Sequence, residues 1–268
     1  FLGDIPYHEG GDERGVAVRE AGRDPLSEAF RMLRSNMTFM NVSAGNGIRS
    51  VLFTSTNPHA GKTFVSTNLA MTFATTGKKV VIMDLDLRRR TFSKQMGHGG
   101  DTNGVSSYLS GSTELQAIIR KSKLSEKLDI IYAGIQPPNP SEMLLSQRME
   151  ELIAELKLHY DYIIIDSIPA MAVADAIITD RLADLSIYVV REGLLDRRQL
   201  PDIERLYREK KFHNMAIILN GASSTKRHGY GYGYGYGYGY GLDEEETTTK
   251  KGFWGKLCEW TRNKFQKK

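Results

Sequence analysis

Cysteine is almost absent from this chain, since Cys258 is the only one in 268 residues. An internal disulfide is therefore excluded, and a reducing compartment is indicated. The six histidines are scattered, so no zinc-type ligand spacing is present. No window reaches the roughly 18 uncharged apolar residues that a membrane span needs, and no signal-peptide pattern opens the sequence. Disulfide scaffolds, zinc modules and spanning segments are excluded for the printed residues.

Positive and negative charges are nearly balanced, apart from one terminal segment. The formal net charge is +4, and residues 250–268 alone hold seven Lys or Arg against one acid. The remainder is near neutral, so nucleic-acid binding is not predicted. The chain begins at Phe1 rather than at Met. We therefore expect a fragment or a processed product.

Alternating strand and helix patterns occupy residues 50 to 220. With 40% hydrophobic and 25% charged residues, the chain can bury the core of one large domain. Apolar runs that suit buried parallel strands cover residues 50–54, 79–84, 128–132, 162–166, 185–190 and 215–220. Helical patterns cover residues 24–40, 63–76, 141–159 and 196–210. The pattern predicts an α/β fold with a mostly parallel central sheet flanked by helices.

The pattern divides the chain into four parts. Residues 1–23 precede the first helix, and residues 24–221 form the predicted domain. Residues 222–249 lack apolar periodicity, contain the Gly and Tyr alternation and are expected to be disordered. Residues 250–268 form a basic amphipathic tail, in which aromatic residues lie near one side of a helix. Binding to an anionic membrane and packing on the protein itself both fit that tail.

A phosphate-binding loop follows the first strand of this domain. Residues 55–63 connect the strand at 50–54 to a helix, as a Walker A loop requires. The first glycine of the usual motif is replaced by Thr56, so the loop is a variant. Lys62 is expected to contact the β- and γ-phosphates, and Thr63 to bind Mg²⁺. The predicted nucleotide-binding residues are Asn57, Pro58, His59, Ala60, Gly61, Lys62, Thr63, Phe64 and Asn220, with a turn-forming role open for Asn220.

Three aspartates stand at or just after the ends of two predicted strands. Asp84 and Asp86 follow the strand at 79–84, and Asp166 ends the strand at 162–166. Ligands of open α/β sheets bind at the carboxyl ends of strands. Asp166 fits a Walker B role at Mg²⁺. Asp84 and Asp86 are candidates to orient Mg²⁺ or an attacking hydroxyl. The simpler alternative for each aspartate is a helix N-cap.

These residues resemble the bacterial tyrosine kinases (BY-kinases) of exopolysaccharide and capsule systems. The resemblance rests on the variant loop at 55–63, the Asp84 to Asp86 motif, the strand ending at Asp166 and a tyrosine cluster after the fold. The Pro-rich segment 134–145 is similar to a characteristic loop of that family. The Glu28, Arg31 and Arg34 triplet is similar to its oligomerisation motif. From the residues alone, a solvated helix face is the preferred explanation of this triplet, and the resemblance favours a subunit contact.

The resemblance implies an ATP- and Mg²⁺-dependent autokinase, with Lys62, Asp84, Asp86 and Asp166 as its catalytic set. It implies a ring, of octamer size, whose subunits phosphorylate one another's tyrosine cluster. It also implies a membrane-embedded co-polymerase portion, a cognate protein-tyrosine phosphatase and a place at the cytoplasmic face of the inner membrane. The tail at 242–268 departs from the family. The implied phosphate acceptors are Tyr230, Tyr232, Tyr234, Tyr236, Tyr238 and Tyr240.

Two other classes of protein remain as alternatives. A membrane-cycling partitioning or positioning ATPase has the same kind of loop, but its signature lysine stands where this chain has Asn57. An interaction scaffold with a degenerate ATP site is the other class, and the intact Lys62, Thr63 and Asp166 argue against it. The Gly and Tyr alternation by itself also fits a flexible, adhesive linker.

Overall fold

The computed structural model describes residues 1–9, 15–18, 22–43, 47–170 and 175–223, all within one compact unit, Phe1–Arg227. These residues form an eight-stranded sheet in the order β1-β8-β7-β2-β6-β3-β5-β4. Every strand pair is parallel except β4 with β5. The strands are β1 (Gly3–Pro6), β2 (Ser50–Ser55), β3 (Val80–Asp84), β4 (Ile119–Lys121), β5 (Leu128–Ile131), β6 (Tyr162–Asp166), β7 (Leu185–Arg191) and β8 (Met215–Ala222).

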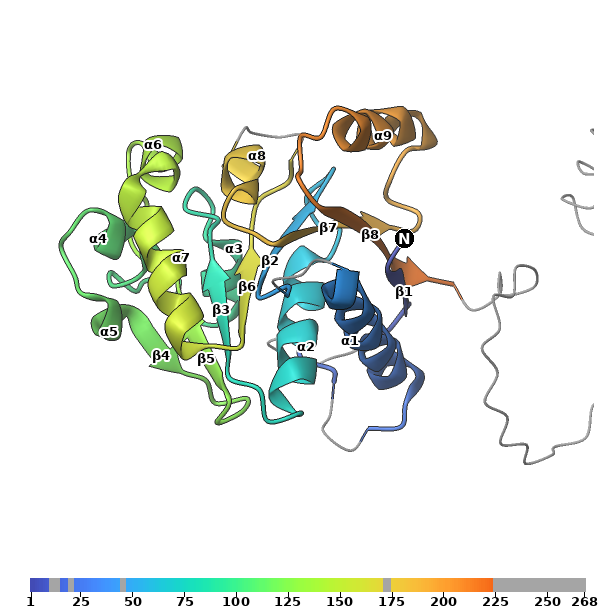
Figure 1. Ribbon diagram of the computed structural model, residues 1–268, viewed down its shortest axis with the longest axis horizontal. Coiled ribbons are helices and arrows are strands. Elements are labelled where there is room, and N and C mark those ends of the chain that lie inside the picture. Colours follow the sequence, from blue (N-terminus) through green and yellow to red (C-terminus); the bar gives the residue numbers. More distant parts are fainter. Residues whose placement is uncertain (10–14, 19–21, 44–46, 171–174, 224–268) are drawn as a thin grey trace, which may run out of the picture. The chain divides into compact units, whose positions relative to one another are not determined.

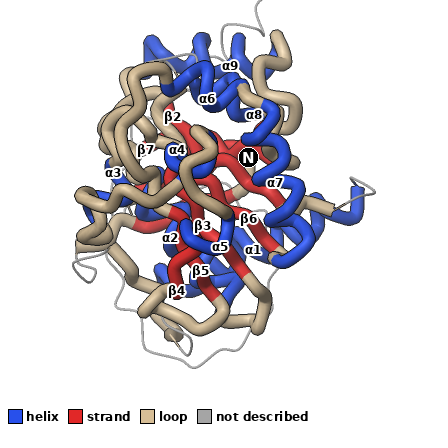
Figure 2. The backbone as a smooth tube through the Cα atoms, turned by 90° about the vertical axis from the view of Figure 1, so that its left-hand side faces the viewer, coloured by secondary structure: helices blue, strands red, loops and turns tan. Residues whose placement is uncertain are grey.

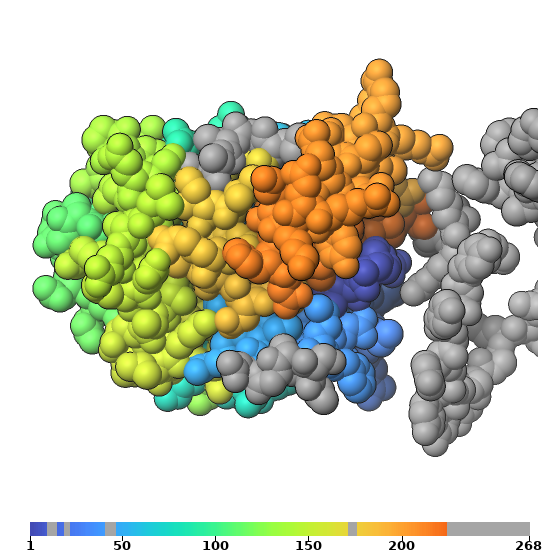
Figure 3. All heavy atoms as spheres, turned by 45° about the horizontal axis from the view of Figure 1, so that its top comes forward, coloured from blue at the N-terminus to red at the C-terminus, as the bar shows by residue number. Residues whose placement is uncertain are grey.

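Helices cover both faces of the sheet, as Figures 1 and 2 show. The predicted α/β architecture is therefore confirmed. Figure 3 shows α6 and α7, in yellow-green, beside α8 and α9, in gold and orange, on one surface. The helices are α1 (Pro25–Ser43), α2 (Lys62–Ala74), α3 (Thr91–Gln95), α4 (Val105–Leu109), α5 (Leu115–Ile118), α6 (Pro140–Leu145), α7 (Gln147–His159), α8 (Asp175–Asp180), the 3₁₀ turn η1 (Arg197–Gln199) and α9 (Leu200–Arg208).

The strands are apolar on both sides because each side meets a different layer of helices. On β2, Val51 and Phe53 pack into the core beneath α1 and α2, whereas Leu52 packs into the core beneath α7. On β6, Ile164 and its neighbour Ile165 divide between the same two cores. Successive side chains of a strand point to opposite faces. A central strand with two covered faces therefore needs an unbroken apolar run.

The helix predicted at 24–40 is confirmed, and so is its start. Asp24 accepts hydrogen bonds from the backbone N–H and the hydroxyl of Ser27, at 2.9 and 2.7 Å. Those bonds lower the pKa of the Asp24 carboxyl. Buried side chains at helical spacing, Leu26, Phe30, Leu33 and Met37, anchor α1 to the sheet. The capping bond and this apolar stripe together define the helix.

The single helix predicted at 141–159 is wrong, because the chain breaks at Ser146. There the backbone is extended, with φ −66° and ψ 152°. The Ser146 hydroxyl donates to the carbonyl of Met143 over 2.7 Å, which ends α6, and α7 begins at the next residue. A serine side chain that bonds to a nearby carbonyl competes with the helical hydrogen bond.

Two strands were not predicted. β1 lies at one edge of the sheet and contains both Gly3 and Pro6, which disfavour strands. Pairing with β8 places Gly3 opposite Ile218, and Ile5 becomes fully buried. β4 has only three residues and pairs with β5 at the other edge. The tyrosine tract at 230–240 and the tail at 250–268 lie outside the described residues.

Candidate active site

The predicted phosphate-binding loop lies between β2 and α2, in the middle of the sheet. His59 and Gly61 have left-handed backbones, with φ 62° and 90°. A Cβ atom on Gly61 would lie 2.2 Å from the amide nitrogen of Asn220. That same amide donates to the carbonyl of Ala60 over 2.9 Å. Asn220, at 5% exposure, therefore supports the loop from β8, and its predicted adenine contact stays a prediction.

The remaining predicted residues lie in the loop and in the first turn of α2. Pro58 and His59 are exposed, and the amide of Asn57 donates to Gln199 over 3.2 Å. The ring of Phe64 packs edge-on against Phe30, with 6.0 Å between the ring centroids. Phe64 therefore faces the core beneath α1. Its contact with nucleotide stays a prediction, and the group that would make it is the backbone N–H.

Lys62 lies among the carboxylates that the sequence predicted around it. Its ammonium is 3.4 Å from the Ser55 hydroxyl. Burial lowers the pKa of Lys62, and the negative charges of Asp166 and Asp86 counteract this effect. The structure thus brings a cation of the loop and carboxylates from β3 and β6 into one site.

Thr63 and Asp166 are in direct contact. The Thr63 hydroxyl donates to Asp166 Oδ2 over 2.5 Å. Asp166 Oδ1 is buried and has no hydrogen-bond partner among the described residues. Burial raises the pKa of Asp166 to about 6, against the hydrogen bond from Thr63 and the charge of Lys62. An unpaired buried carboxylate oxygen next to a hydroxyl is the donor set that Mg²⁺ prefers, so these residues fit the predicted metal.

Asp84 is fully buried at the end of β3. Its Oδ1 accepts from the backbone N–H of Asp86 at 2.9 Å, and its Oδ2 accepts from the hydroxyl and backbone N–H of Ser93 at 2.6 and 2.9 Å. Burial raises the pKa of Asp84 to about 7, although the Ser93 bonds lower it. Asp84 therefore holds the segment that carries Asp86. Its predicted contact with Mg²⁺ remains a prediction.

Asp86 is the more accessible of the two, with 7% exposure against 0%. Its Oδ1 accepts from the backbone N–H of Arg89 and its Oδ2 from the Thr91 hydroxyl, each at 2.8 Å. Asp86 therefore caps the turn after β3, but it is not the helix N-cap that the simpler alternative predicted, because the N-cap of α3 is Arg90. Each carboxylate oxygen retains further acceptor capacity. Asp86 can cap the turn and still accept a proton or a hydrogen bond.

Sequence reasoning missed Ser93, which joins two parts of the site. Besides its bonds to Asp84, its hydroxyl accepts from the backbone N–H of Ala133 at 3.1 Å. A lone serine in a short helix gave no signal. Two arginines of the same segment make parallel links, since Arg88 donates to the Ser141 hydroxyl at 2.9 Å and Arg90 to the Gly134 carbonyl at 3.1 Å. The segment after Asp86 is thus bound to the Pro-rich segment 134–145.

The predicted oligomerisation triplet is on α1, apart from the phosphate-binding loop. Arg31 forms an ion pair with Glu28 at 2.5 Å and donates to the carbonyl of Gly22. Arg34 donates to the carbonyl of Thr72 in α2 over 2.9 Å. Both arginines therefore have partners within their own chain. Whether the triplet also contacts another subunit stays a prediction.

A central parallel sheet, a phosphate loop leading into α2 and a paired Thr63 and Asp166 define a P-loop nucleotide-binding protein. A family described as an AAA domain matches residues 53–190. The septum site-determining protein MinD of Pyrococcus horikoshii shares the fold, with 21% identity and a TM-score of 0.53 over 64% of this chain and 70% of that chain.

The chain belongs to the bacterial tyrosine-protein kinase family. It is 34% identical to the tyrosine-protein kinase YwqD of Bacillus subtilis, covering 81% of this chain and 90% of the relative. The kinase domain of the Escherichia coli tyrosine kinase ETK shares 33% identity and superimposes with a TM-score of 0.71, over 88% of this chain and 94% of that chain. The chain spans only 29% of a relative from Klebsiella pneumoniae, to which it is 36% identical over 80% of its own length.

Among the described residues, we find no helix with the length and apolar character needed to cross a membrane.

Proposed function

We propose that this chain is an ATP-dependent protein-tyrosine kinase that phosphorylates the tyrosine tract of a neighbouring copy of itself. The observation that carries the proposal is the convergence of Lys62, Thr63 and Asp166 on one site, with Asp84 and Asp86 at its side. The likeness to the YwqD and ETK kinases supports the choice of a tyrosine as acceptor.

ATP supplies the phosphoryl group, and the backbone of residues 57–63 with the Lys62 ammonium is suited to hold its phosphates. A bond forms between the phenol oxygen of a tyrosine and the γ-phosphorus. The bond from that phosphorus to the β–γ bridging oxygen breaks, and ADP leaves with the electron pair. The phenol proton passes to a carboxylate oxygen of Asp86. Catalysis then rests on positioning and on charge stabilisation around the transferring group.

The aspartates divide the work according to their burial. Asp86 is the partly accessible carboxylate and accepts the phenol proton. Asp84 has both oxygens occupied by Asp86 and Ser93 and is a positioning residue. Asp166 and Thr63 are the residues that would hold Mg²⁺. When bound, this ion neutralises charge that develops on the phosphate oxygens.

The tyrosine tract is long enough to reach another subunit. Tyr240 lies 17 positions beyond Ser223, the last described residue. Fully extended, such a segment spans roughly 60 Å. The six tyrosines are chemically equivalent acceptors at alternate positions, so several of them are proposed to enter one site in turn. Each phosphate adds about 1.5 to 2 negative charges, which favours release of the modified tract through repulsion.

The cellular setting is proposed by analogy with the relatives. The Klebsiella pneumoniae relative is described as belonging to a cps region. We place this chain in exopolysaccharide or capsule synthesis and export, at the cytoplasmic face of the inner membrane. Its proposed partners are other copies in a ring, a membrane-embedded co-polymerase portion and a cognate protein-tyrosine phosphatase. The basic segment 250–268 is proposed to contact an anionic membrane surface.

A positioning ATPase is the main competing function, because the fold is shared with MinD. That class transfers the phosphoryl group to water. The identity to MinD is 21%, against 33% to the ETK kinase domain. The tyrosine tract has no role in a water-directed reaction, whereas a kinase uses it as a substrate.

Labelled ATP separates these functions. The purified chain is incubated with γ-labelled ATP and Mg²⁺, beside Lys62→Met and a variant with all six tract tyrosines changed to Phe. Label on the wild type, at least 100-fold less on Lys62→Met and little on the tyrosine-free variant would support the kinase. Phosphate release without label would show a switch ATPase. If the protein acquires no label and releases no phosphate, it is a scaffold.

A further inference from the structure

Arg191 ends β7, on the side of the phosphate-binding loop away from the metal residues. The strand β2, which leads into the loop, lies between β6, which ends at Asp166, and β7, which ends at Arg191. On the next strand, β8, the register partner of Arg191 is Asn220, whose amide supports the loop at Ala60. One flank of the loop therefore carries a carboxylate, and the other flank carries a guanidinium.

The side chain of Arg191 extends toward the loop. A Cβ atom on Gly221 would lie 3.8 Å from Arg191 Cγ and 3.9 Å from Arg191 Nε. A Cβ atom on Gly61 would lie 3.9 Å from Arg191 Nη1. The stem thus passes Gly221 on β8, and the guanidinium ends beside Gly61, directly before the first residue of α2.

The backbone at Arg191 is held by its neighbours. Its carbonyl accepts hydrogen bonds from the N–H groups of Leu194 and Leu195, at 3.2 and 3.3 Å. The next residue, Glu192, donates its N–H to the Asn220 carbonyl over 2.9 Å. The sheet and the turn after β7 therefore fix the point from which this side chain reaches the loop.

Arg191 differs from the other half-buried arginines in having no partner. Its guanidinium makes no hydrogen bond or ion pair to any residue that the structure describes. A charge that is partly removed from water without a partner is unfavourable, so this guanidinium is suited to an anion that enters from outside. The other half-buried arginines of the described residues each donate to a carbonyl, hydroxyl or carboxylate, and they are Arg31, Arg34, Arg49, Arg88, Arg90 and Arg148.

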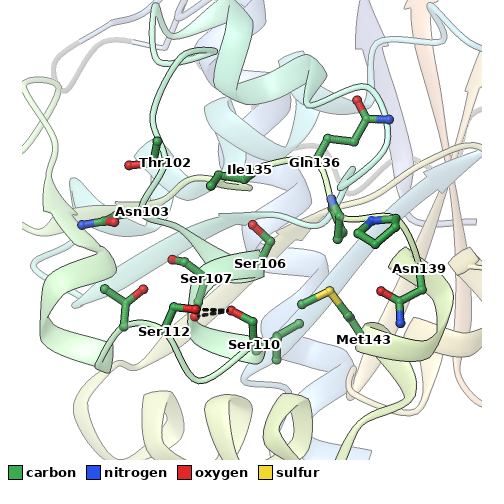
Figure 4. A pocket seen from close by; sticks show the side chains of 14 residues that line it. Thr102, Asn103, Ser106, Ser107, Ser110, Ser112, Ile135, Gln136, Asn139 and Met143 are labelled. Atoms are coloured by element: carbon green, nitrogen blue, oxygen red, sulfur yellow. Dashed lines mark hydrogen bonds between the residues drawn. The ribbon is translucent and has the colours of Figure 1, made fainter.

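The concave surface near β5 offers no such group. It lies between α4 and the segment that follows β5, with side chains from residues 102–113 and 135–143 around it (Figure 4). Among the described residues that line it, none is Lys, Arg or His. A phosphate there would lose hydration without gaining an opposite charge. The β7 flank of the loop is therefore the better place for an anionic group.

We propose that Arg191 binds the α-phosphate of ATP. This inference rests on the proposed kinase function for its ligand, and it assigns a residue to the part of the nucleotide that is not transferred. Lys62, Thr63 and Asp166 are the proposed contacts of the β- and γ-phosphates and of Mg²⁺. The α-phosphate is the remaining anionic group, and a guanidinium forms charge-assisted hydrogen bonds with phosphate oxygens.

The assignment predicts which nucleotides depend on Arg191. ATP and ADP both contain the α-phosphate, so the loss of this contact should weaken both by the same factor. The metal contacts lie on the other flank of the loop, so the effect should be the same with Mg²⁺ and with EDTA. This separates Arg191 from Thr63, whose contribution is proposed to require the metal.

Binding is measured by calorimetry on the full chain, with ADP and a non-hydrolysable ATP analogue. Arg191→Met keeps the length of the stem and removes the charge, and it should weaken both nucleotides about tenfold. Arg191→Lys should bind with intermediate affinity. The exposed Arg197 of η1 supplies the matched control, since Arg197→Met should bind as the wild type does. Wild-type affinity of Arg191→Met for ADP would overturn the proposal.

The two diastereomers of ADPαS test the contact at the α-phosphate itself. Each diastereomer carries sulfur in place of one non-bridging α-oxygen, and sulfur accepts a weaker hydrogen bond. The wild type should discriminate between the two diastereomers about threefold more strongly than Arg191→Met does. Equal discrimination by both proteins would place the guanidinium elsewhere on the nucleotide and refute the assignment.

Thermal unfolding of the nucleotide-free chain provides the control for folding. Arg191→Met should be at least as stable as the wild type, because the guanidinium has no partner among the described residues. A clear loss of stability would show that Arg191 has a structural partner within the chain and would also overturn the proposal. These measurements require no phosphorylation, so failure of the Arg191 contact and failure of the proposed kinase reaction are distinguishable.

Discussion

Asp84 and Asp166 are register partners at the ends of the adjacent parallel strands β3 and β6. Both carboxyls are buried, and the burial raises the pKa of each. Parallel strands bring their carboxyl ends to one edge of the sheet, so two aspartates 82 positions apart meet beside the phosphate-binding loop. Their negative charges concentrate where a metal ion and Lys62 can offset them.

The first prediction concerns the Thr63 hydroxyl. Thr63→Ala should weaken Mg²⁺-dependent nucleotide binding about 10- to 100-fold, because the hydroxyl beside Asp166 is a proposed metal contact. Thr63→Ser keeps the hydroxyl and should bind nearly as the wild type does. Titration of a fluorescent ATP analogue in Mg²⁺ and in EDTA measures the effect. Equal losses in both conditions would contradict a role at the metal.

The second prediction tests Ser93 as a positioning residue. Ser93→Ala removes a hydrogen bond that lowers the pKa of Asp84 and leaves the N–H of Ala133 unpaired. The pKa of Asp84 should therefore rise above its value of about 7, and the acid limb of the pH–rate profile should move to higher pH. We also expect a stability loss of about 1–2 kcal/mol.

Autophosphorylation rates between pH 6 and pH 9, together with urea unfolding, measure both effects of Ser93→Ala. The exposed Ser110→Ala serves as the matched control. A lower stability combined with an unshifted pH profile would reduce Ser93 to a packing residue.

The third prediction concerns Asp184, at the opposite end of β2. Its Oδ2 accepts from the N–H groups of Arg49 and Ser50 at 2.9 and 2.8 Å, and its Oδ1 accepts from Lys157 at 2.9 Å. Burial raises the pKa of Asp184, but the bonds from Lys157 and the backbone outweigh it and lower the pKa overall. Asp184→Ala should cost about 3 kcal/mol at pH 7, because it leaves backbone donors without partners.

The sign of the pH dependence follows from the lowered pKa. An unfolded aspartate titrates near pH 3.9, so the stabilisation is complete above about pH 4 and is lost as the pH falls through the folded-state value. The stability difference between wild type and Asp184→Ala should shrink from pH 7 to pH 3. Asp202→Ala, in an exposed ion pair with Arg205, should change stability by less than about 0.5 kcal/mol. A pH-independent difference for Asp184→Ala would contradict the ionic role.

The fourth prediction tests the proposed ring. Arg31→Ala combined with Arg34→Ala should convert the assembly into monomers, as sedimentation velocity would show. The loss of the bond from Arg34 to the Thr72 carbonyl should also lower stability by about 1 kcal/mol. Glu204→Ala with Arg208→Ala removes a comparable surface pair on α9 and should leave the assembly intact. Sedimentation that does not change in the folded double variant would disprove the subunit contact.

Local patterns predicted the elements that carry their own signal. The six central strands are apolar on both faces, and the start of α1 is marked by Asp24 and an apolar stripe. β1 and β4 escaped prediction. They are strands because they pair with β8 and β5, not because of their own residue types. The break at Ser146 escaped as well, because a continuous helical pattern conceals one side-chain hydrogen bond to Met143.

For the site, the sequence predicted the residues that are close to the phosphate loop or at strand ends. It did not predict Ser93 or the amide of Asn220 under the loop. These two contacts join residues that are distant along the chain, and their side chains are of common types. The same holds for the links from Arg88 and Arg90 to the Pro-rich segment.

The sequence by itself determined the six central strands, the phosphate-binding loop and the candidate residues Lys62, Thr63, Asp84, Asp86 and Asp166, because apolar periodicity and the loop motif are local properties of the chain. Only the tertiary structure decided how the aspartates differ. Burial and hydrogen bonding depend on the neighbours of a side chain in space. They make Asp84 a fully enclosed support, leave Asp86 partly accessible, and give Asp166 one oxygen on Thr63 and one unpaired oxygen for a cation.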